Sequence, residues 1–195
     1  AFTTAEEKWN YVVDRIIHHH KKHRPILVGT VSVEDSELLS KKLNKARLKH
    51  KVLNAKQNEE EAKIISKAGI KDAITIATNM AGRGTDIKVE DDTELVVILT
   101  ELNESTRIDN QLKGRTSRQG AAGFTETIIS LEDSIFKRVN VDFIKRFKLT
   151  NPLPNSFIKA FKAIQEELES NSYSARRSAL KFDDVVREQR NIFYN

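Results

Sequence analysis

The alternation of short apolar runs with amphipathic helical patterns leaves few folds open to this 195-residue chain. The runs have the length of buried strands, and the segments between them repeat apolar residues every three or four positions. The expected strands are Ile26–Gly29, Val52–Leu53, Ile74–Ala77, Leu95–Leu99 and Thr125–Leu131. The expected helices are Thr3–His23, a segment that begins after Ser32, Glu59–Ala68 and Ser105–Gln119. This order predicts a parallel, doubly wound α/β sheet with flanking helices.

The first two helices have recognisable starts, and three of the strands lead to candidate ligand loops. Thr4 stands three residues before Glu7, which is the spacing of a capping box, and Ser32 is the candidate cap of the second helix.

In open α/β sheets, ligands bind at the carboxyl ends of the strands. The loops after Gly29, Ala77 and Leu99 are therefore expected to face one site.

The composition of the chain changes after Gly123, because no glycine occurs beyond that residue. Pro152 and Pro154 are stiff, helix-breaking residues and mark a boundary. From residue 156 to residue 195 nothing interrupts a helix, which would be ~60 Å long. Such a helix is too long to bury itself on one small domain, so it should pack against other helices. The alternative is two ordinary helices joined near residues 171–174.

Composition excludes several kinds of site. The chain has no cysteine and therefore neither disulfides nor thiolate metal ligands. No apolar run approaches the ~20 residues of a membrane span and no signal-peptide pattern opens the sequence, so a cytoplasmic location is the default expectation. The net charge of +5 selects no partner. The adjacent histidines His18, His19 and His20 point in different directions on a helix, so we expect a basic helix end and no metal site.

Glycine and arginine are concentrated in the middle of the chain. Five of the seven glycines lie between Gly82 and Gly123, as in segments where the backbone turns tightly or approaches a ligand. Arg115 and Arg118 are three residues apart, so on a helix they would extend from one face and could bind phosphate oxygens. A pair with this spacing also occurs as an ordinary surface feature that forms weak ion pairs.

The sequence contains no phosphate-binding loop of the form GxxxxGK[ST], and no expected strand ends in an acidic pair suited to Mg²⁺. Phosphate-binding arginines without a phosphate loop favour half of a two-domain motor. The other half would hold the nucleotide, and this half would extend an arginine finger across the cleft.

Several segments resemble the second nucleotide-binding domain of SecA, the preprotein translocase ATPase. They are GTVSVEDSELLS, VLNAK, ITIATNMAGRGTDI, RIDNQLKGRTSRQG and SLEDS. ALKFDDVVREQRNIFY resembles the long central helix of the helical scaffold domain in that family. The resemblance runs from about Thr4 to the last residue. It implies a RecA-like motor domain at 1–148, a linker at 149–155 and the start of the helical scaffold at 156–195.

The resemblance also implies roles for particular residues. Gln111, Arg115 and Arg118 match the sixth helicase-type motif, with Arg118 as the arginine finger and Arg115 beside it on the phosphates. The residues implied at the nucleotide or at the interdomain cleft are Gly29, Thr30, Ser32, Gly82, Arg83, Gly84, Asp86 and Gln111. The implied ligand is ATP with Mg²⁺, whose protein ligands would lie on a first nucleotide-binding domain that precedes this piece in the intact chain.

The implied partners are preprotein substrates, the SecYEG translocon and the first nucleotide-binding domain of the same protein. Peripheral attachment to the cytoplasmic membrane is expected, and no specific nucleic acid. The chain departs from the family pattern where Ser117, Ala121 and Ala122 replace a glycine, an acidic residue and a proline, although both arginines are kept. Divergence of this kind suits an accessory SecA that serves a restricted set of substrates.

Two other interpretations stay open. The C-terminal RecA-like half of a superfamily-2 RNA helicase would share the fold and the arginine motif. RNA grooves, however, favour basic tracks with stacking aromatic residues, whereas the aromatic residues here cluster in the terminal helices. A docking module without enzymatic activity would use the long helix to bind a partner, and its arginines would be structural.

Overall fold

The computed structural model describes residues 1–53, 63–78, 86–116, 122–137 and 151–194, and within them five strands form one parallel sheet. The strands are β1 (Ile26–Thr30), β2 (Lys51–Leu53), β3 (Ile74–Thr78), β4 (Leu95–Leu99) and β5 (Gly123–Thr127). Their order across the sheet is β2-β3-β1-β4-β5, and every neighbouring pair is parallel. The predicted α/β class is confirmed.

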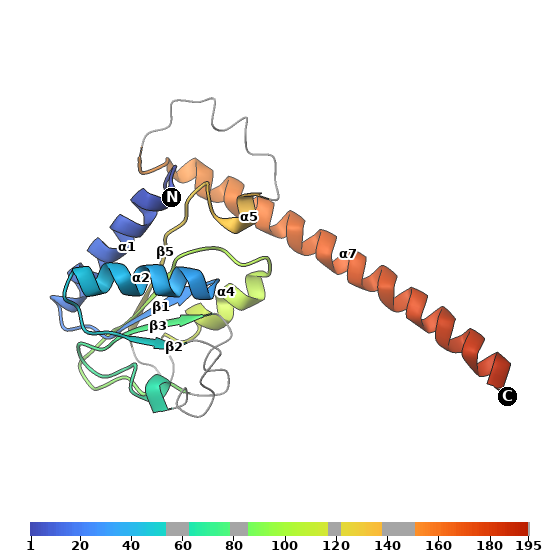
Figure 1. The fold of residues 1–195 in the computed structure, drawn as a ribbon, viewed down its shortest axis with the longest axis horizontal. Coiled ribbons are helices and arrows are strands. Elements are labelled where there is room, and N and C mark those ends of the chain that lie inside the picture. The colour runs from blue at the N-terminus through green and yellow to red at the C-terminus, as the bar shows by residue number, and fades with distance from the viewer. Residues whose placement is uncertain (54–62, 79–85, 117–121, 138–150, 195) are drawn as a thin grey trace.

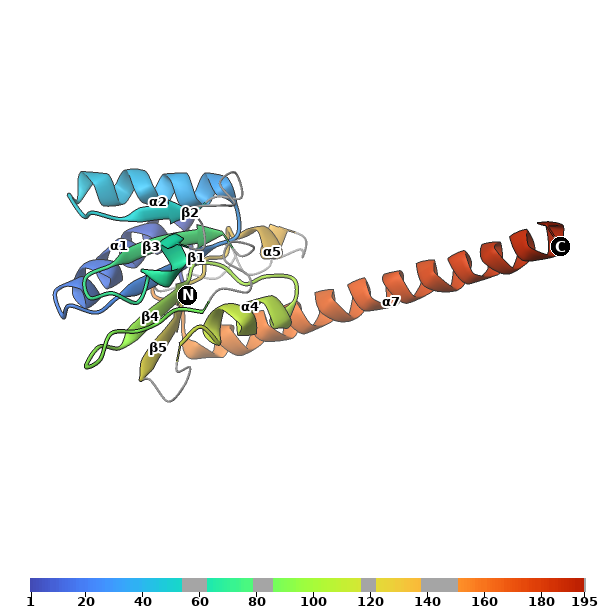
Figure 2. The same ribbon diagram turned by 90° about the horizontal axis from the view of Figure 1, so that it is seen from below.

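Helices cover both faces of the sheet (Figures 1 and 2). α1 (Ala5–His20) and α2 (Val33–Lys45) pack on one face, and α4 (Thr106–Lys113) packs on the other. Residues 63–66 are also helical, but residues 67 and 68 form a turn, so the helix expected at Glu59–Ala68 ends two residues early; residues 59–62 lie outside the described residues.

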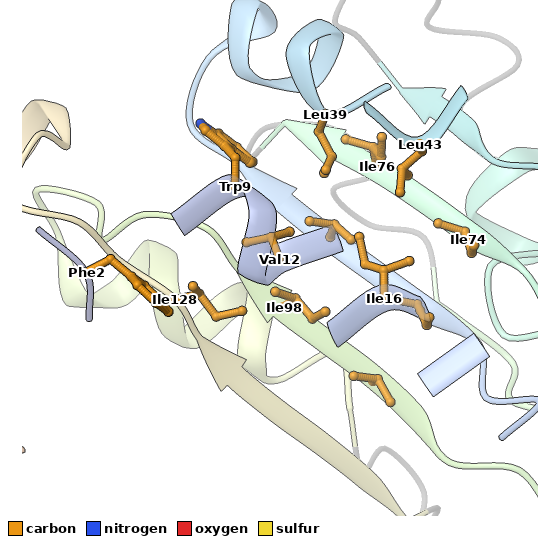
Figure 3. Close-up of a cluster of buried hydrophobic side chains, with 13 residues drawn as sticks. Phe2, Trp9, Val12, Ile16, Leu39, Leu43, Ile74, Ile76, Ile98 and Ile128 are labelled. Carbon is orange, nitrogen blue, oxygen red and sulfur yellow. The ribbon is translucent and has the colours of Figure 1, made fainter. Parts of the chain in front are cut away.

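The central strands are buried on both sides because their side chains alternate between two apolar clusters. Figure 3 shows the cluster under α1 and α2, which includes Trp9, Val12, Ile16, Leu39, Leu43, Ile74, Ile76 and Ile98. Leu27, Val97 and Leu99 point to the opposite cluster, against which Leu112 of α4 packs. This two-sided burial explains why the strands read as continuous apolar runs.

The predicted caps of the first two helices are both present. Thr4 Oγ1 accepts a hydrogen bond from the Glu7 N–H at 3.3 Å, so α1 begins at Ala5 and not at the predicted Thr3, and it ends at His20 instead of His23. Ser32 Oγ accepts the Asp35 N–H at 3.0 Å and donates to the Asp35 carboxylate at 2.8 Å. Each cap satisfies an amide that has no partner within its helix.

The last predicted strand, Thr125–Leu131, is wrong in its bounds. β5 ends at Thr127, and the Ile128 N–H still donates to the Leu99 carbonyl oxygen at 2.8 Å. The chain then leaves β4 and pairs with the N-terminal segment, where the Phe2 N–H donates to the Ile129 carbonyl oxygen at 2.8 Å. Residues that favour strands, such as Thr125, Thr127, Ile128 and Ile129, stand on both sides of this change, so the sequence does not reveal the change of partner.

α7 (Asn155–Tyr194) is one helix of 40 residues, which confirms the unbroken helix and rules out two helices joined near 171–174. Its first turns pack on a third apolar cluster, in which the fully buried Phe161 ring lies 4.6 Å from the ring of Phe136 in α5 (Ser134–Lys137). Farther along, Tyr173 is 61% exposed, and the helix projects away from the sheet (Figure 2). No helix in the described ranges is both long and apolar enough to cross a membrane.

Candidate functional site

Three threonines mark the carboxyl ends of the three central strands. Thr30 of β1 is in register with Thr78 of β3, and Thr100 follows β4 directly on the other side of β1. The Thr100 hydroxyl donates to the Gly29 carbonyl oxygen at 2.9 Å. Thr30 Oγ1 is buried and has no hydrogen-bond partner within the described part of the chain. The strand ends expected to face one site therefore do share one polar edge of the sheet.

Gly29 brings α4 close to this edge. A Cβ atom on Gly29 would lie 2.0 Å from Leu112 Cδ2, so only glycine lets Leu112 take its present position against β1. The resemblance placed Gly29 at a cleft, and the structure adds a packing role for it. Thr30 follows Gly29 in β1, and Ser32 comes two residues later as the cap of α2.

The predicted helix Ser105–Gln119 is wrong at its C-terminal end. α4 ends at Lys113 with Gly114 as its cap, and the Arg115 N–H donates to the Leu112 carbonyl oxygen at 3.0 Å in a tight turn. The Thr116 hydroxyl and N–H both donate to the Lys113 carbonyl oxygen, at 2.9 and 3.1 Å. These bonds satisfy a terminal carbonyl group that continued helix would otherwise use. Arg115 therefore lies just beyond the helix and not on its face.

The structure brings some of the predicted site residues together and leaves others out. Gln111 is exposed in the last turn of α4, and Arg115 is half-buried after it; both flank the Leu112 that contacts β1. Asp86 is exposed at the start of the segment that leads to β4. The remaining predicted residues, Gly82, Arg83, Gly84 and Arg118, lie outside the described residues.

A buried polar network next to α4 was not found by sequence reasoning. The Asp109 carboxylate, 1% exposed, accepts hydrogen bonds from the Asn103 N–H at 3.1 Å and from Asn103 Nδ2 at 2.6 Å. Gln165 of α7 donates to the same carboxylate at 2.7 Å and to the Asn103 carbonyl oxygen at 2.7 Å. A weak signal was present in the sequence, because Gln165 lies four residues after Phe161, on the apolar face of the helix.

One turn further along α7, Glu169 contacts the first residues of α4. Its carboxylate accepts hydrogen bonds from the hydroxyl groups of Ser105 and Thr106, both at 2.8 Å, and from the Thr106 N–H at 3.2 Å. The hydroxyl groups of Ser105 and Thr106, together with the Thr106 amide, lower the pKa of Glu169. The carboxylate is therefore ionised at neutral pH. Within the described ranges, no group of three His, Asp or Glu side chains is placed to hold a metal ion.

A parallel five-stranded sheet with helices on both faces, followed by a long C-terminal helix, defines a RecA-like α/β domain. Solved structures agree on the fold. A chain in the crystal structure of the E. coli DEAD-box protein SrmB bound to RraA aligns with a TM-score of 0.54 at 19% identity, over 69% of this chain and 77% of that chain. Domain 2 of the Mss116p DEAD-box helicase, bound to an RNA duplex, aligns with a TM-score of 0.52 at 17% identity, over 72% and 56%.

Sequence comparisons give the family. The family model of the SecA P-loop domain matches residues 1–97 and 88–153, and that of the SecA wing and scaffold domain matches residues 152–195. Protein translocase subunit SecA 2 of Clostridioides difficile (strain 630) is 49% identical over 212 aligned positions, which cover all of this chain and 27% of the relative. The chain belongs to the SecA family, as the motifs predicted. It spans about a quarter of the length of that relative.

Proposed function

We propose that this chain is one half of the ATP-driven motor of a SecA-type protein translocase. It would supply the arginine side of an ATP site and couple hydrolysis to the export of preproteins across the cytoplasmic membrane. The observation that carries the proposal is the position of α4. Gly29 allows α4 to pack beside the carboxyl end of β1, and Arg115 follows directly after the helix at this polar edge.

The division of labour between two halves follows from the sequence. The chain has no GxxxxGK[ST] loop, so the phosphate loop and the Mg²⁺ ligands would belong to a first nucleotide-binding domain of the same protein. At this edge the Thr30 hydroxyl has no partner within the described part of the chain, and Arg115, which follows α4 by two residues, carries a guanidinium suited to phosphate oxygens. ATP with Mg²⁺ supplies the phosphoryl group that is transferred. We expect the isolated fragment to hydrolyse no ATP.

The proposed mechanism is electrostatic. Arg118 would stabilise the negative charge that develops on the transferred phosphoryl group, an effect worth roughly 10³–10⁵ in rate for arginine fingers. Arg115 would orient the phosphates beside it. Gly82, Arg83, Gly84 and Asp86 would line the nucleotide side of the same cleft, together with Thr30, Ser32 and Gln111.

We assign residues 1–148 to the motor domain, 149–155 to a linker and 156–195 to the start of the helical scaffold. The scaffold helix would act as a lever between the motor and the segment that grips the substrate. The partners would be preproteins and the SecYEG translocon, with the protein in the cytoplasm and peripherally bound to the membrane. The identity with a relative named SecA 2 supports an accessory member of the family.

The test is ATP turnover by the intact parent protein, with Arg118→Ala as the variant. An unfolded preprotein with translocon-bearing membranes is added in one arm, and single-stranded RNA in the other. We expect stimulation by preprotein alone and a loss of kcat of at least ~10³-fold in Arg118→Ala. Stimulation by RNA alone would instead identify a helicase, and full turnover by Arg118→Ala would point to structural arginines in a docking module.

A further inference from the structure

The N-terminus of α4 is capped by a side chain of α7. Ser105 occupies the cap position, but its hydroxyl makes no capping hydrogen bond to an amide of α4. It donates to Glu169 Oε1, while Glu169 Oε2 accepts both the N–H and the hydroxyl of Thr106. A carboxylate at this end also interacts favourably with the helix dipole. The first turn of α4 thus depends on a residue 63 positions away from Thr106.

Gln165 makes a second tie between the same two helices. Because Gln165 and Glu169 are four residues apart, they lie on one face of α7, which runs beside α4 (Figure 2). Gln165 Nε2 donates to the buried Asp109 carboxylate and to the Asn103 carbonyl oxygen, both at 2.7 Å. Loss of this donor would leave buried oxygens with fewer partners, which is costly for a carboxylate.

The C-terminal end of α4 leads to Arg115, which belongs to the proposed ATP site. α4 has eight residues, so it is only ~12 Å long and moves as one piece. Its N-terminal half is tied to α7, and Leu112 near its C-terminus rests against Gly29 of β1. A shift of the first turn relative to β1 therefore reaches Arg115, which follows the helix by two residues.

We infer that Gln165 and Glu169 are positioning residues of the ATPase site, which make the placement of Arg115 after α4 follow the placement of α7. This inference rests on the proposed function. The apolar contact of Phe161 with Phe136 attaches α7 to the domain separately. Removing the polar ties therefore leaves α7 docked and loosens α4 alone.

A loosened α4 has a particular kinetic signature. The proposed arginine side of the site acts on charge that develops in the transition state, so a displaced Arg115 lowers kcat. The KM for ATP changes little, because most ground-state contacts of the nucleotide would belong to the other half of the motor. A misplacement of ~1 Å can cost up to about 10²-fold. We expect about a tenfold loss of kcat for each alanine substitution.

The experiment compares Glu169→Ala, Gln165→Ala and Glu169→Gln in the intact parent protein, with kcat and KM for ATP measured beside the melting temperature. Glutamine at 169 can still accept from Thr106 and donate to Ser105, so it should restore most of kcat. Glu167→Ala is the matched control, because Glu167 is an exposed glutamate of the same helix. Thr106→Val removes only the hydrogen bond from the Thr106 hydroxyl to Glu169 and leaves no cavity. It replaces the alanine variants as the test if they do not fold.

The expected result is a lower kcat with KM within twofold in both alanine variants, and wild-type kinetics in Glu167→Ala. Wild-type kcat in both alanine variants would overturn the inference, as would Glu169→Gln turning over as slowly as Glu169→Ala. If the alanine variants do not fold, an unchanged kcat in Thr106→Val overturns it. Arg118→Ala is measured in parallel. An inactive Arg118→Ala beside fully active alanine variants refutes the positioning role alone. Full activity of Arg118→Ala, or a wild-type protein without turnover, refutes the proposed function and this inference with it.

Discussion

Lys8 and Asp133 form a buried ion pair that joins α1 to the segment before α5. Lys8 Nζ lies 2.5 Å from Asp133 Oδ1, and the two side chains are only 3% and 1% exposed. Ser130 donates two further hydrogen bonds to the carboxylate, from its N–H at 2.8 Å and its hydroxyl at 2.6 Å. Burial nevertheless raises the pKa of Asp133 to about 6, because desolvation outweighs the attraction of Lys8 and the Ser130 bonds.

Replacing Lys8 by methionine keeps most of the side-chain volume and removes the cation. When folding raises the pKa of a carboxyl group, the free energy of unfolding of the protein falls as pH rises from the pKa of that group in the unfolded chain to its pKa in the folded chain. In the wild-type chain this loss runs from 3.8 to about 6 and then stops. In Lys8→Met the folded pKa of Asp133 is higher, so the loss continues above pH 6 at about 1.4 kcal/mol per pH unit. Relative to the wild type, the variant should therefore lose up to about 3 kcal/mol of stability between pH 6 and pH 8.

Thermal unfolding of the 195-residue chain at pH 5 and at pH 8 measures this difference. At about 2–4 °C per kcal/mol for a chain of this size, the melting temperature of Lys8→Met should fall relative to that of the wild type by up to about 6–12 °C between pH 5 and pH 8. Lys41→Met, which removes an exposed charge from α2, controls for the change in net charge. An equal fall at both pH values, or none at pH 8, would refute the reasoning.

Two further substitutions test the packing. In Gly69→Ala the new Cβ would lie 2.1 Å from the Lys88 carbonyl oxygen, which is backbone and cannot rotate away. We expect a loss of about 1–3 kcal/mol in denaturant unfolding, against a smaller loss for Gly114→Ala, whose Cβ would lie 3.0 Å from the nearest atom. Phe161→Ala empties a fully buried site between α5 and α7 and should cost about 3–5 kcal/mol. Limited proteolysis should then cut the first turns of α7 faster than in the wild type, and equal cleavage rates would contradict a role for Phe161 in docking the helix.

The sequence alone predicts an element correctly where the burial of apolar residues or a local signal determines that element. β4 was predicted with its observed bounds, because Leu95–Leu99 is buried along its whole length and no polar residue interrupts it. The length of α7 was predicted because no proline or glycine interrupts it. The starts of α1 and α2 followed from Thr4 and Ser32, whose hydroxyl groups act within three residues.

The sequence-based predictions failed where a structure depends on residues far apart in the sequence, or where local hydrogen bonds compete with those of a helix. α4 ends early because Gly114 and the Thr116 hydroxyl terminate it, although its polar sequence permits continued helix. The ties from Gln165 and Glu169 connect residues 56 to 64 positions apart, and a single sequence does not show which side chains meet across that separation. The motifs of the candidate site can therefore be recognised in the sequence and their roles stay predictions, whereas the contacts that position α4 cannot be predicted from it.

The pairing of Phe2 with residues 129–131 has a consequence for synthesis on the ribosome. Phe2 forms hydrogen bonds with Ile129 and Leu131, and Thr3 forms one with Asn151. The N-terminal segment therefore packs on segments of the chain that are synthesised much later. At about 5–20 residues per second, these partners emerge roughly 6–30 s after Phe2. During that interval the apolar face of α1 has only β1, α2, β3 and β4 to cover it, in the order in which they appear. The N-terminal segment can therefore complete its pairing only after residues 129–151 have left the exit tunnel.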